Sequence, residues 1–311
     1  MGRGDLSDAE WERLRPFLPV SNRRCGRWRD HRQVIDGILH RVRTGVQWRD
    51  LPERFGPWKT VYERHRLWSA DGTWERLLQQ VQAAADAAGE IDWDVSVDST
   101  IVRAHQHAAG AHRPAAGTRL KGGRRARTPG RNAVAEPARP PGGGGAGSEG
   151  LGRSRGGFTT KLHLSADGRC RPLSLTVTPG QRADCTQFEP VLEKIRIPKP
   201  GQGRPRKKPD SVAADKAYSN GPVRNYLRRR GIRHTIPEKL DSQAARLRKG
   251  SRGGRPPGFD EERYKKRNTV ERAINRLKQH RAVATRYDKR GYVYLGTATA
   301  TAAALSIWLR T

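Results

Sequence analysis

The sequence predicts an α/β protein in two parts: a small all-helical domain at residues 1–89, then a mixed sheet flanked by helices at residues 90–311. Three observations predict this fold class. Residues 5–88 place apolar side chains at helical spacing between short turns that contain glycine. From residue 91 the pattern changes to the alternation of a strand. A strand pair is then followed by alternating strands and helices, an order typical of a mixed sheet covered by helices.

Four helices are expected in the N-terminal domain. The first begins at Ser7, because Glu10 follows three residues later in a capping-box pattern. The second, HRQVIDGILHRVRTG, ends at Gly45. Short helices joined by turns with glycine are typical of a helix-turn-helix. This domain is therefore a candidate for DNA recognition.

The third helix of this domain is the candidate recognition helix. Residues 60–68 carry Arg64, His65 and Arg66, and the two arginines are the predicted DNA contacts. A helical bundle with a basic surface explains the same pattern equally well, because helix-turn-helix patterns have low specificity.

The first strand of the second domain carries a carboxylate at its end. In DWDVSVDSTIV, Val95 and Val97 share one face, whereas Asp94 and Asp98 share the other with their polar neighbours. We expect a strand that buries its valines and presents Asp98, with Asp94 and Asp92 as rival carboxylates.

The remaining elements follow from turn and cap residues. FTTKLHLSADGRCRPLSLTVTPG predicts two strands joined at Asp167-Gly168. DCTQFEPVLEKI predicts a helix capped by Asp184. SVAADKAY predicts a short buried strand that ends in Asp215. A helix with Pro222 near its first position follows, and then the strand IRHTIP.

Residues 113–157 are dominated by glycine, proline and arginine. Apolar side chains are too few there to offset the entropy of ordering, so we expect a disordered insert within the second domain. Such a basic insert can follow DNA phosphates, and a solvated flexible insert is an equally good explanation.

The charge of the chain indicates a polyanionic partner. Its 62 Lys and Arg against 31 Asp and Glu leave a formal charge of +31, which opposes compaction unless a partner neutralises it. Nucleic acid is the first candidate. No membrane partner is expected, because no apolar run is long enough to span a bilayer, and TATATAAALSIWL indicates a packing helix.

Cysteine and histidine spacings give little support for a soft-metal site. Cys25, Cys170 and Cys185 are odd in number and form no CxxC pair, which favours a reducing compartment over disulfides or a cysteine zinc site. His105 and His107 form an HxH pair, but no further Cys or His lies at ligand spacing.

The run YKKRNTVERAINRLK near the C-terminus carries the most chemical information. On a helix that turns about 100° per residue, with Arg267 at zero, Lys278 falls at about 20°, Glu271 at about 40° and Tyr264 at about 60°. One acid, two cations and a phenol therefore share a narrow face beside an apolar stripe. A solvated face with i,i+4 ion pairs is the alternative.

Asp98, Asp215 and Glu271 form a chemically sensible set of carboxylates. Two of these carboxylates stand at the ends of strands, and the third projects from a helix that can pack beside the sheet. Carboxylate oxygens suit Mg²⁺ or Mn²⁺, and two such ions can promote an in-line phosphoryl displacement. Taken singly, each residue has a structural alternative as a cap or turn residue, and Glu261 and Glu262 compete with Glu271.

The chain resembles a bacterial insertion-sequence DDE transposase, of the type with a Y-(2)-R-(3)-E-(6)-K signature. That spacing is present as Tyr264, Arg267, Glu271 and Lys278. VSVDST and AADKAYSNGPVRNYLRRRGIRHTIPEK are similar to the two Asp blocks of the family. LGRSRGGFTTKLHLSADG, TPGQRADCTQFEP and the Trp-rich N-terminus resemble insertion-sequence family five.

The resemblance implies an RNase H-like catalytic domain in which Asp98, Asp215 and Glu271 hold Mg²⁺ or Mn²⁺ as a pair of ions. Tyr264, Arg267 and Lys278 are then expected to contact DNA at the transposon end. The implied reaction cleaves the terminal inverted repeats and joins the freed 3′-OH to target DNA, without a covalent protein–DNA intermediate.

The implied partners are double-stranded DNA, both repeats and target, and a second copy of the chain in a dimer or higher multimer. The implied location is the cytoplasm of a bacterium, associated with the nucleoid. A non-enzymatic or degenerate DNA-binding protein is the alternative that charge alone supports equally well. A nuclease of the same fold is a third, which would cut DNA without joining ends.

Overall fold

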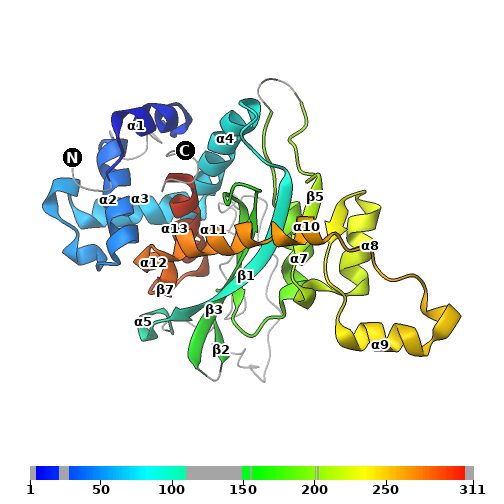
Figure 1. Ribbon diagram of the computed structural model, residues 1–311. Coiled ribbons are helices and arrows are strands. Elements are labelled where there is room, and N and C mark those ends of the chain that lie inside the picture. The colour runs from blue at the N-terminus through cyan, green and yellow to red at the C-terminus, as the bar shows by residue number, and fades with distance from the viewer. Residues whose placement is uncertain are drawn as a thin grey trace, which may run out of the picture.

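The computed structural model describes residues 5–20, 28–109, 149–154, 156–199, 201 and 203–304. A helical part and a β-sheet with its covering helices lie side by side (Figure 1). The helical part is made of α1 (Asp8–Leu14), α2 (His31–Thr44), α3 (Trp58–Ala70), α4 (Thr73–Ala87) and α13 (Gly291–Ala304), with the 3₁₀ turns η1 (Arg15–Phe17), η2 (Trp48–Asp50) and η3 (Glu53–Phe55).

Local signals placed the first helices correctly. Ser7 caps α1 in a full capping box, with Glu10 accepting from the Ser7 amide at 2.8 Å and the Glu10 amide donating to the Ser7 hydroxyl at 3.3 Å. Gly45 ends α2 in the left-handed region at φ +73°, where glycine has no steric penalty. Both sequence expectations are confirmed.

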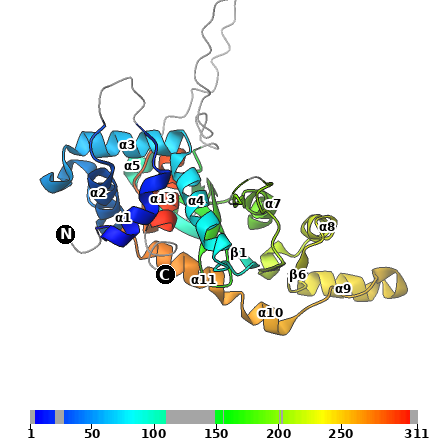
Figure 2. The ribbon, with the colours of Figure 1, turned by 90° about the horizontal axis from the view of Figure 1, so that it is seen from above.

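The last described helix, α13, packs against α3 and α4 of the N-terminal region (Figures 1 and 2). A buried polar chain crosses this contact. The Trp74 indole N–H donates to His65 Nδ1 at 3.1 Å, and His65 Nε2 lies 3.1 Å from the Thr297 hydroxyl. Thr297 donates to Asp288 at 3.1 Å, and Asp288 pairs with buried Arg41 at 3.3 Å. Segments from both ends of the chain therefore share one interior.

Within the described residues, the sheet has seven strands with β1 at its centre. The strands are β1 (Asp94–Ala104), β2 (Gly152–Ser154), β3 (Gly157–Ala166), β4 (Pro172–Pro179), β5 (Ser211–Ala214), β6 (Arg233–Thr235) and β7 (Thr285–Arg286). β3 pairs antiparallel with β1, β2 and β4, whereas β5 and β7 pair parallel with β1, and β6 parallel with β5. The predicted mixed sheet and its Asp167-Gly168 hairpin turn are confirmed.

The helices around the sheet are α5 (Gln106–Ala109), α7 (Phe188–Glu193), α8 (Gly221–Arg229), α9 (Leu240–Arg248), α10 (Glu261–Lys265), α11 (Asn268–Lys278) and α12 (Arg281–Ala284), with η4 (Asp184–Gln187), η5 (Lys216–Tyr218) and η6 (Gly250–Gly253).

The two faces of β1 contact different elements. Ser96 meets Thr269 of α11 at 3.4 Å, whereas Ser99 bonds to Asp184 of η4 at 2.6 Å. Because strand side chains alternate, α11 and η4 lie on opposite faces.

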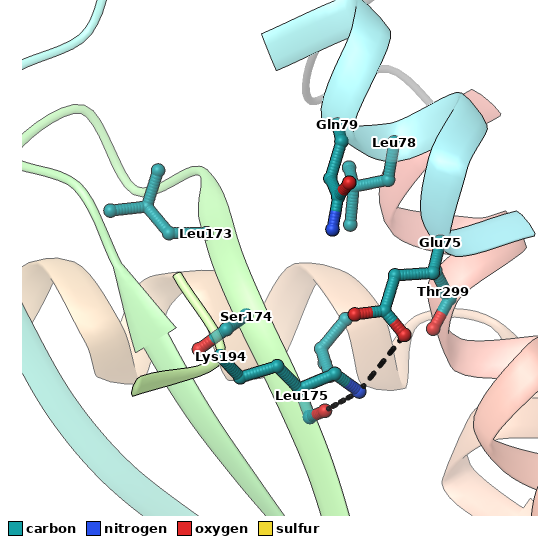
Figure 3. A pocket seen from close by; sticks show the side chains of 8 residues that line it. All are labelled: Glu75, Leu78, Gln79, Leu173, Ser174, Leu175, Lys194 and Thr299. Carbon is teal, nitrogen blue, oxygen red and sulfur yellow. Dashed lines mark hydrogen bonds and ion pairs between the residues drawn. The ribbon is translucent and has the colours of Figure 1, made fainter. Parts of the chain in front are cut away.

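Figure 3 shows where the helical part meets the sheet. Lys194, just after α7, donates to the Leu175 carbonyl at 2.8 Å and pairs with Glu75 of α4 at 3.4 Å. The pocket between them has a volume of about 10 Å³, enough for about one water molecule. This junction therefore connects α4 to β4 and offers no room for a ligand.

Two expectations about the chain are limited by what the structure describes. Most of the predicted insert at residues 113–157, namely residues 113–148, lies outside the described residues, as does Cys25. The end of that range forms β2 instead of a flexible loop, because it adds backbone hydrogen bonds to the edge of β3.

Cys170 and Cys185 are free thiols. Across the described ranges, no helix has the length and apolarity that crossing a membrane requires.

Candidate active site

The three predicted carboxylates come from elements that meet on one face of the sheet. Asp98 lies within β1 and not at its end as expected, because pairing with β3 continues as far as Arg103. Asp215 directly follows β5, and Glu271 lies in α11, which packs on β1. The parallel register of β1 and β5 ends at Val97 opposite Ala214. Asp98 and Asp215 therefore occupy the next position on neighbouring strands, where parallel strands present side chains to the same edge.

Arg267 connects two of these carboxylates. Its guanidinium donates through Nη1 to Asp98 Oδ2 at 3.1 Å and through Nη2 to Glu271 Oε1. The Arg267 and Asp98 side chains are 17% and 23% exposed, so the pair is only partly screened by solvent. The arrangement shows that Asp98 and Glu271 converge on one cationic group.

The electrostatics of Asp98 reflect its acidic neighbours. Burial raises the pKa of Asp98, and the charges of Glu271 and Asp215 raise it further. The Ser99 amide, which donates to Asp98 at 2.8 Å, and the Arg267 charge lower that pKa and oppose the rise. Glu271 and Asp215 therefore lie close enough to Asp98 for their charges to disfavour its charged form.

The helix that carries the C-terminal run is interrupted, which the sequence pattern did not predict. α10 ends at Lys265 and α11 begins at Asn268, with a tight turn between them in which Arg267 N–H bonds to the Tyr264 carbonyl three residues back. Helical dihedrals continue through the turn at Arg267. Tyr264 and Arg267 consequently remain neighbours, with the guanidinium carbon 5.7 Å from the Tyr264 ring centroid.

Lys278, at the far end of α11, also points to β1. Its ammonium donates to the Thr100 hydroxyl at 2.8 Å and to the Ile101 carbonyl at 3.2 Å. The contact lies two residues beyond Asp98 along the strand. Glu271 and Lys278 of α11, with Arg267 at its N-cap, thus follow one stretch of β1, as the helical-face argument requires.

The rival carboxylates are engaged elsewhere. Asp94 accepts from the Ser211 hydroxyl at 2.5 Å and pairs with Arg263 at 3.8 Å. Asp92 accepts from the Asp94 amide at 3.0 Å. Glu261 and Glu262, in the first turn of α10, both pair with Lys265, at 3.4 and 3.0 Å. None of these four bonds to Arg267.

Asp184 does not cap its own helix, contrary to expectation. The chain forms η4 from Asp184 and α7 only from Phe188, and the Asp184 carboxylate turns toward the sheet. It accepts from the Ser99 hydroxyl at 2.6 Å and pairs with Lys161 of β3 at 2.9 Å. Bonds to two strands replace the single amide that a cap would provide.

This cluster directly behind Asp98 was missed by the sequence reasoning. Burial raises the pKa of Asp184, but the hydrogen bonds from Ser99 and Lys161 outweigh it and leave that pKa below its usual value. Burial lowers the pKa of neighbouring His163 to about 4, so this imidazole is neutral at pH 7. The alternation of Lys161 and His163 along one strand face was the available signal. Their partner lies 21 or more residues away, which no local pattern reveals.

Burial of the phenol in this region raises the pKa of Tyr218, and the carboxylates of Asp98, Asp184 and Asp215 add to that rise. Tyr218 is 1% exposed and packs against Phe188. The residue follows Asp215 by three positions in η5. Its phenol is therefore close enough to both the candidate site and the η4 cluster to respond to their carboxylates.

The N-terminal candidates have different environments. Arg64 is 6% exposed, bonds to His31 at 2.9 Å and stacks on Trp28 with its guanidinium carbon 4.1 Å from the ring centroid. Its neighbour His65 is fully buried, whereas Arg66 is exposed. A DNA contact by Arg64 would require the side chain to leave this packing, because its charged end faces the interior.

The donor set fits a hard divalent cation in chemistry, since carboxylate oxygens are the ligands that Mg²⁺ prefers. As placed, the described residues contain no group of three or more His, Cys, Asp and Glu side chains close enough to hold a metal ion. Arg267 instead lies between Asp98 and Glu271. His105 and His107 pack on each other, and His105 stacks on Tyr287 at 4.7 Å.

A family model for the transposase DDE domain matches residues 91–304. The chain belongs to the DDE transposase family. A second model, for transposases of the IS4/5 family, matches residues 6–78. The mixed sheet with its helices therefore coincides with the DDE domain of this transposase, and α1 to α4 fall largely in the second match.

Relatives of this DDE transposase carry matching names. A protein of Burkholderia cepacia, the uncharacterized 16.2 kDa protein of insertion element IS402, is 36% identical over 112 residues, 33% of this chain and 76% of that protein. A Brucella ovis protein named as a transposase for insertion sequence element IS6501 is 29% identical over 158 residues, 49% of this chain and all of that protein. The uncharacterized protein y4sN of Sinorhizobium fredii is 41% identical over 120 residues, 38% of this chain and 87% of its own length. No solved structure matches the chain.

Proposed function

We propose that this transposase cleaves DNA at the terminal inverted repeats of its insertion sequence and joins the freed 3′-OH ends to target DNA. Asp98, Asp215 and Glu271 are the proposed catalytic carboxylates. The observation that carries the proposal is the convergence of Asp98 and Glu271 on Arg267, with Asp215 next to Asp98 in the strand register.

An RNase H-like sheet is the proposed fold of the catalytic part. Its support is the strand order: three successive antiparallel strands, β1, β3 and β4, and then β5 and β6 added in parallel on the other side of β1. This order brings the end of β5 next to the middle of β1. The parallel pair β1 and β5 would thus carry two of the proposed acids, and a helix the third.

The three carboxylates would hold Mg²⁺ or Mn²⁺, proposed as two ions. Bound there, such ions supply Lewis-acid stabilisation of the oxygens that attack and leave the phosphorus. In the proposed reaction, a water oxygen bonds to phosphorus while the 3′ oxygen leaves and takes a proton. The oxygen of that 3′-OH then bonds to the phosphorus of a target phosphodiester, while the 3′ oxygen of the target leaves and takes a proton. Asp98 and Glu271 can serve as ligands only after releasing the hydrogen bonds of Arg267, which frees this guanidinium for a DNA phosphate.

The Y(2)R(3)E(6)K residues are proposed to position DNA. Tyr264, Arg267 and Lys278 lie along the stretch of β1 that starts at Asp98. A ring and two cations there suit a phosphate backbone and an unpaired base at the element's end. In the N-terminal region, exposed Arg66 is the better placed of the two predicted contacts, because Arg64 is packed inside. A homodimer on DNA, in the cytoplasm of a bacterium and near its nucleoid, completes the proposal.

Strand cleavage and joining on DNA that carries the element's ends test this function. Asp98→Asn, Asp215→Asn and Glu271→Gln should each lower both reactions more than about a hundredfold in Mg²⁺ or Mn²⁺, since each removes a charge from the site. Glu262→Gln is the matched control, because this exposed carboxylate of α10 pairs only with Lys265 among the described residues.

The outcomes separate the alternatives. Full activity in all three variants would refute the assignment of these carboxylates. Cleavage without joining would indicate a nuclease of the same fold. Salt-sensitive DNA binding with neither reaction, at any divalent ion concentration, would indicate a non-enzymatic DNA-binding protein.

A further inference from the structure

The loop that leads into β5 carries an unusual cationic sequence, Gly203-Arg204-Pro205-Arg206-Lys207-Lys208. It lies on the chain segment that ends in Asp215, and Figure 1 shows it extending away from the body of the molecule next to β5. The mechanism proposed above does not use it. Its composition and its anchoring both indicate a binding function.

The base of the loop is fixed. Ile197 and Arg206 form an antiparallel bridge, with N–H···O distances of 3.0 and 2.8 Å. The Arg206 guanidinium carbon lies 3.9 Å from the ring centroid of buried Trp93 and pairs with Asp210 at 3.0 Å. These contacts hold the loop at a set position, so that little order has to be gained when it binds.

Four residues of the loop are exposed: Gly203 and Arg204 in the tip, and Lys207 and Lys208 between the bridge and β5. Within the described part of the chain, Arg204, Lys207 and Lys208 form no ion pair, whereas Arg206 among them does. The Lys207 charge still lowers the pKa of Glu193. The loop therefore presents three exposed cations on both sides of a fixed bridge. A polyanion is the partner that such a surface fits.

The residues around Arg204 indicate which surface of DNA is contacted. Gly203 has no side chain, so the backbone can approach a groove closely. Pro205 fixes its own φ, lacks an N–H and favours an extended conformation at Arg204. An extended, narrow Gly-Arg-Pro segment fits the minor groove, about 6 Å wide, better than the major groove, which accepts a helix. Arginine in particular is attracted to the narrow minor groove of A·T tracts, where the negative potential is enhanced.

We infer that the Gly203–Lys208 loop binds the minor groove of A·T-rich duplex DNA, with Arg204 inserted in the groove and Lys207 and Lys208 on the flanking phosphates. The inference rests on the DNA-binding part of the proposed function and deepens it. Arg204 and Asp215 are eleven positions apart in the chain, at most about 36 Å if extended. The A·T tract therefore lies within about eleven base pairs of the cleaved phosphodiester.

Binding to three short duplexes of equal length tests the inference, with the full chain and without divalent metal. One carries a central A·T tract, one a G·C tract and one an inosine·C tract. Inosine·C has the major groove of G·C but lacks its minor-groove amino group. Wild type should bind the A·T and inosine·C duplexes about fivefold or more tighter than the G·C duplex, which corresponds to about 1 kcal/mol or more of groove discrimination. Equal binding of all three, or inosine·C behaving like G·C, would overturn minor-groove reading.

Variants locate the effect in the loop. Arg204→Ala should bring the A·T to G·C affinity ratio close to one, and Arg204→Lys should also lower it, because lysine keeps the charge without the planar group. Lys208→Ala should weaken all three duplexes alike and reduce the salt slope by about one. Arg276→Ala, an exposed arginine of α11, is the matched control and should leave the ratio unchanged.

A preserved ratio in Arg204→Ala would refute the role of this residue. Because the substituted side chains are exposed, the variants should melt at the same temperature as wild type, and measuring their melting temperatures checks that they fold. Because binding is measured without metal, the result is independent of catalysis. If the protein fails to cleave DNA, its preference for A·T duplexes can still be measured. If that preference is absent, the cleavage assays of the Asp98, Asp215 and Glu271 variants still test the proposed function.

Discussion

Acidification should destabilise this protein through His65, the buried histidine at the contact between α3 and α13. Burial lowers the pKa of His65 to about 4. Its Nδ1 accepts the indole N–H of Trp74 at 3.1 Å, which leaves Nε2 to donate to Thr297. Protonation would place a second N–H against the Trp74 donor, so the folded state resists the proton.

The sign and size of the effect follow from linkage. The unfolded chain binds a proton at His65 near pH 6.5, whereas the folded chain does so only near pH 4. Between these values the unfolded state holds more protons, so stability is full above about pH 6.5 and falls as the pH decreases toward 4. A difference of about 2.5 pKa units corresponds to about 3 kcal/mol, of which about 2 kcal/mol is lost by pH 4.5.

Urea unfolding at a series of pH values from 7.5 to about 4.5 measures this loss. Other groups titrate in the same window, His163 among them, so the informative quantity is the difference between wild type and His65→Gln. The variant should lose about 2 kcal/mol less than wild type over this range. His107→Gln, which removes an exposed histidine, should follow the wild-type curve. Parallel curves for wild type and His65→Gln would refute the argument.

Three further outcomes follow from the contacts. Asp184→Asn removes the partly buried charge that pairs with Lys161, which keeps its bond to the Arg182 carbonyl, and should lower the free energy of unfolding by about 2 kcal/mol in urea; an unchanged midpoint would show the pair to be unimportant. Lys278→Ala should reduce the salt slope of DNA binding by about one if the ammonium contacts a phosphate; a slope equal to that of wild type in a filter-binding titration would contradict that contact. Ser7→Ala removes the α1 cap and should destabilise by about 1 kcal/mol in the same urea assay, with Ser7→Gly costing less; equal losses would point to another cause.

Local chemistry explains why so much of the fold could be predicted. The Ser7 box, the Gly45 stop and the Asp167-Gly168 turn each depend on residues within a few positions of one another. The apolar positions in β1 likewise predict burial, with Val95 and Val97 at 0% and 1% exposure, although Ser96 between them is buried as well under α11. Such signals are complete within one segment. They need no knowledge of which segments pack together.

The parts that could not be predicted depend on distant partners. Asp184 has the position of a helix cap, but Ser99 and Lys161 offer it stronger bonds than a single amide does. Arg64 lies among exposed-looking charges in the sequence, and only the packing of Trp28 and His31 around it explains its burial. Both cases involve polar residues whose partners lie on other elements. A periodicity analysis assigns such residues to the surface, because it registers that a side chain is charged but not which distant residue it pairs with.

Arg267 shows how the sequence and the site fit together. Burial raises the pKa of Asp98, and the charges of Glu271 and Asp215 raise it further, so the surroundings of Asp98 disfavour its charged form unless a cation lies nearby. Placing Arg267 four residues before Glu271 gives the free protein an internal cation that bonds to both Asp98 and Glu271. In the proposed function, the same guanidinium would turn to a DNA phosphate once a divalent ion is bound. The i,i+4 spacing of an ordinary helical ion pair thus also lets one guanidinium connect Glu271 of α11 to Asp98 of β1.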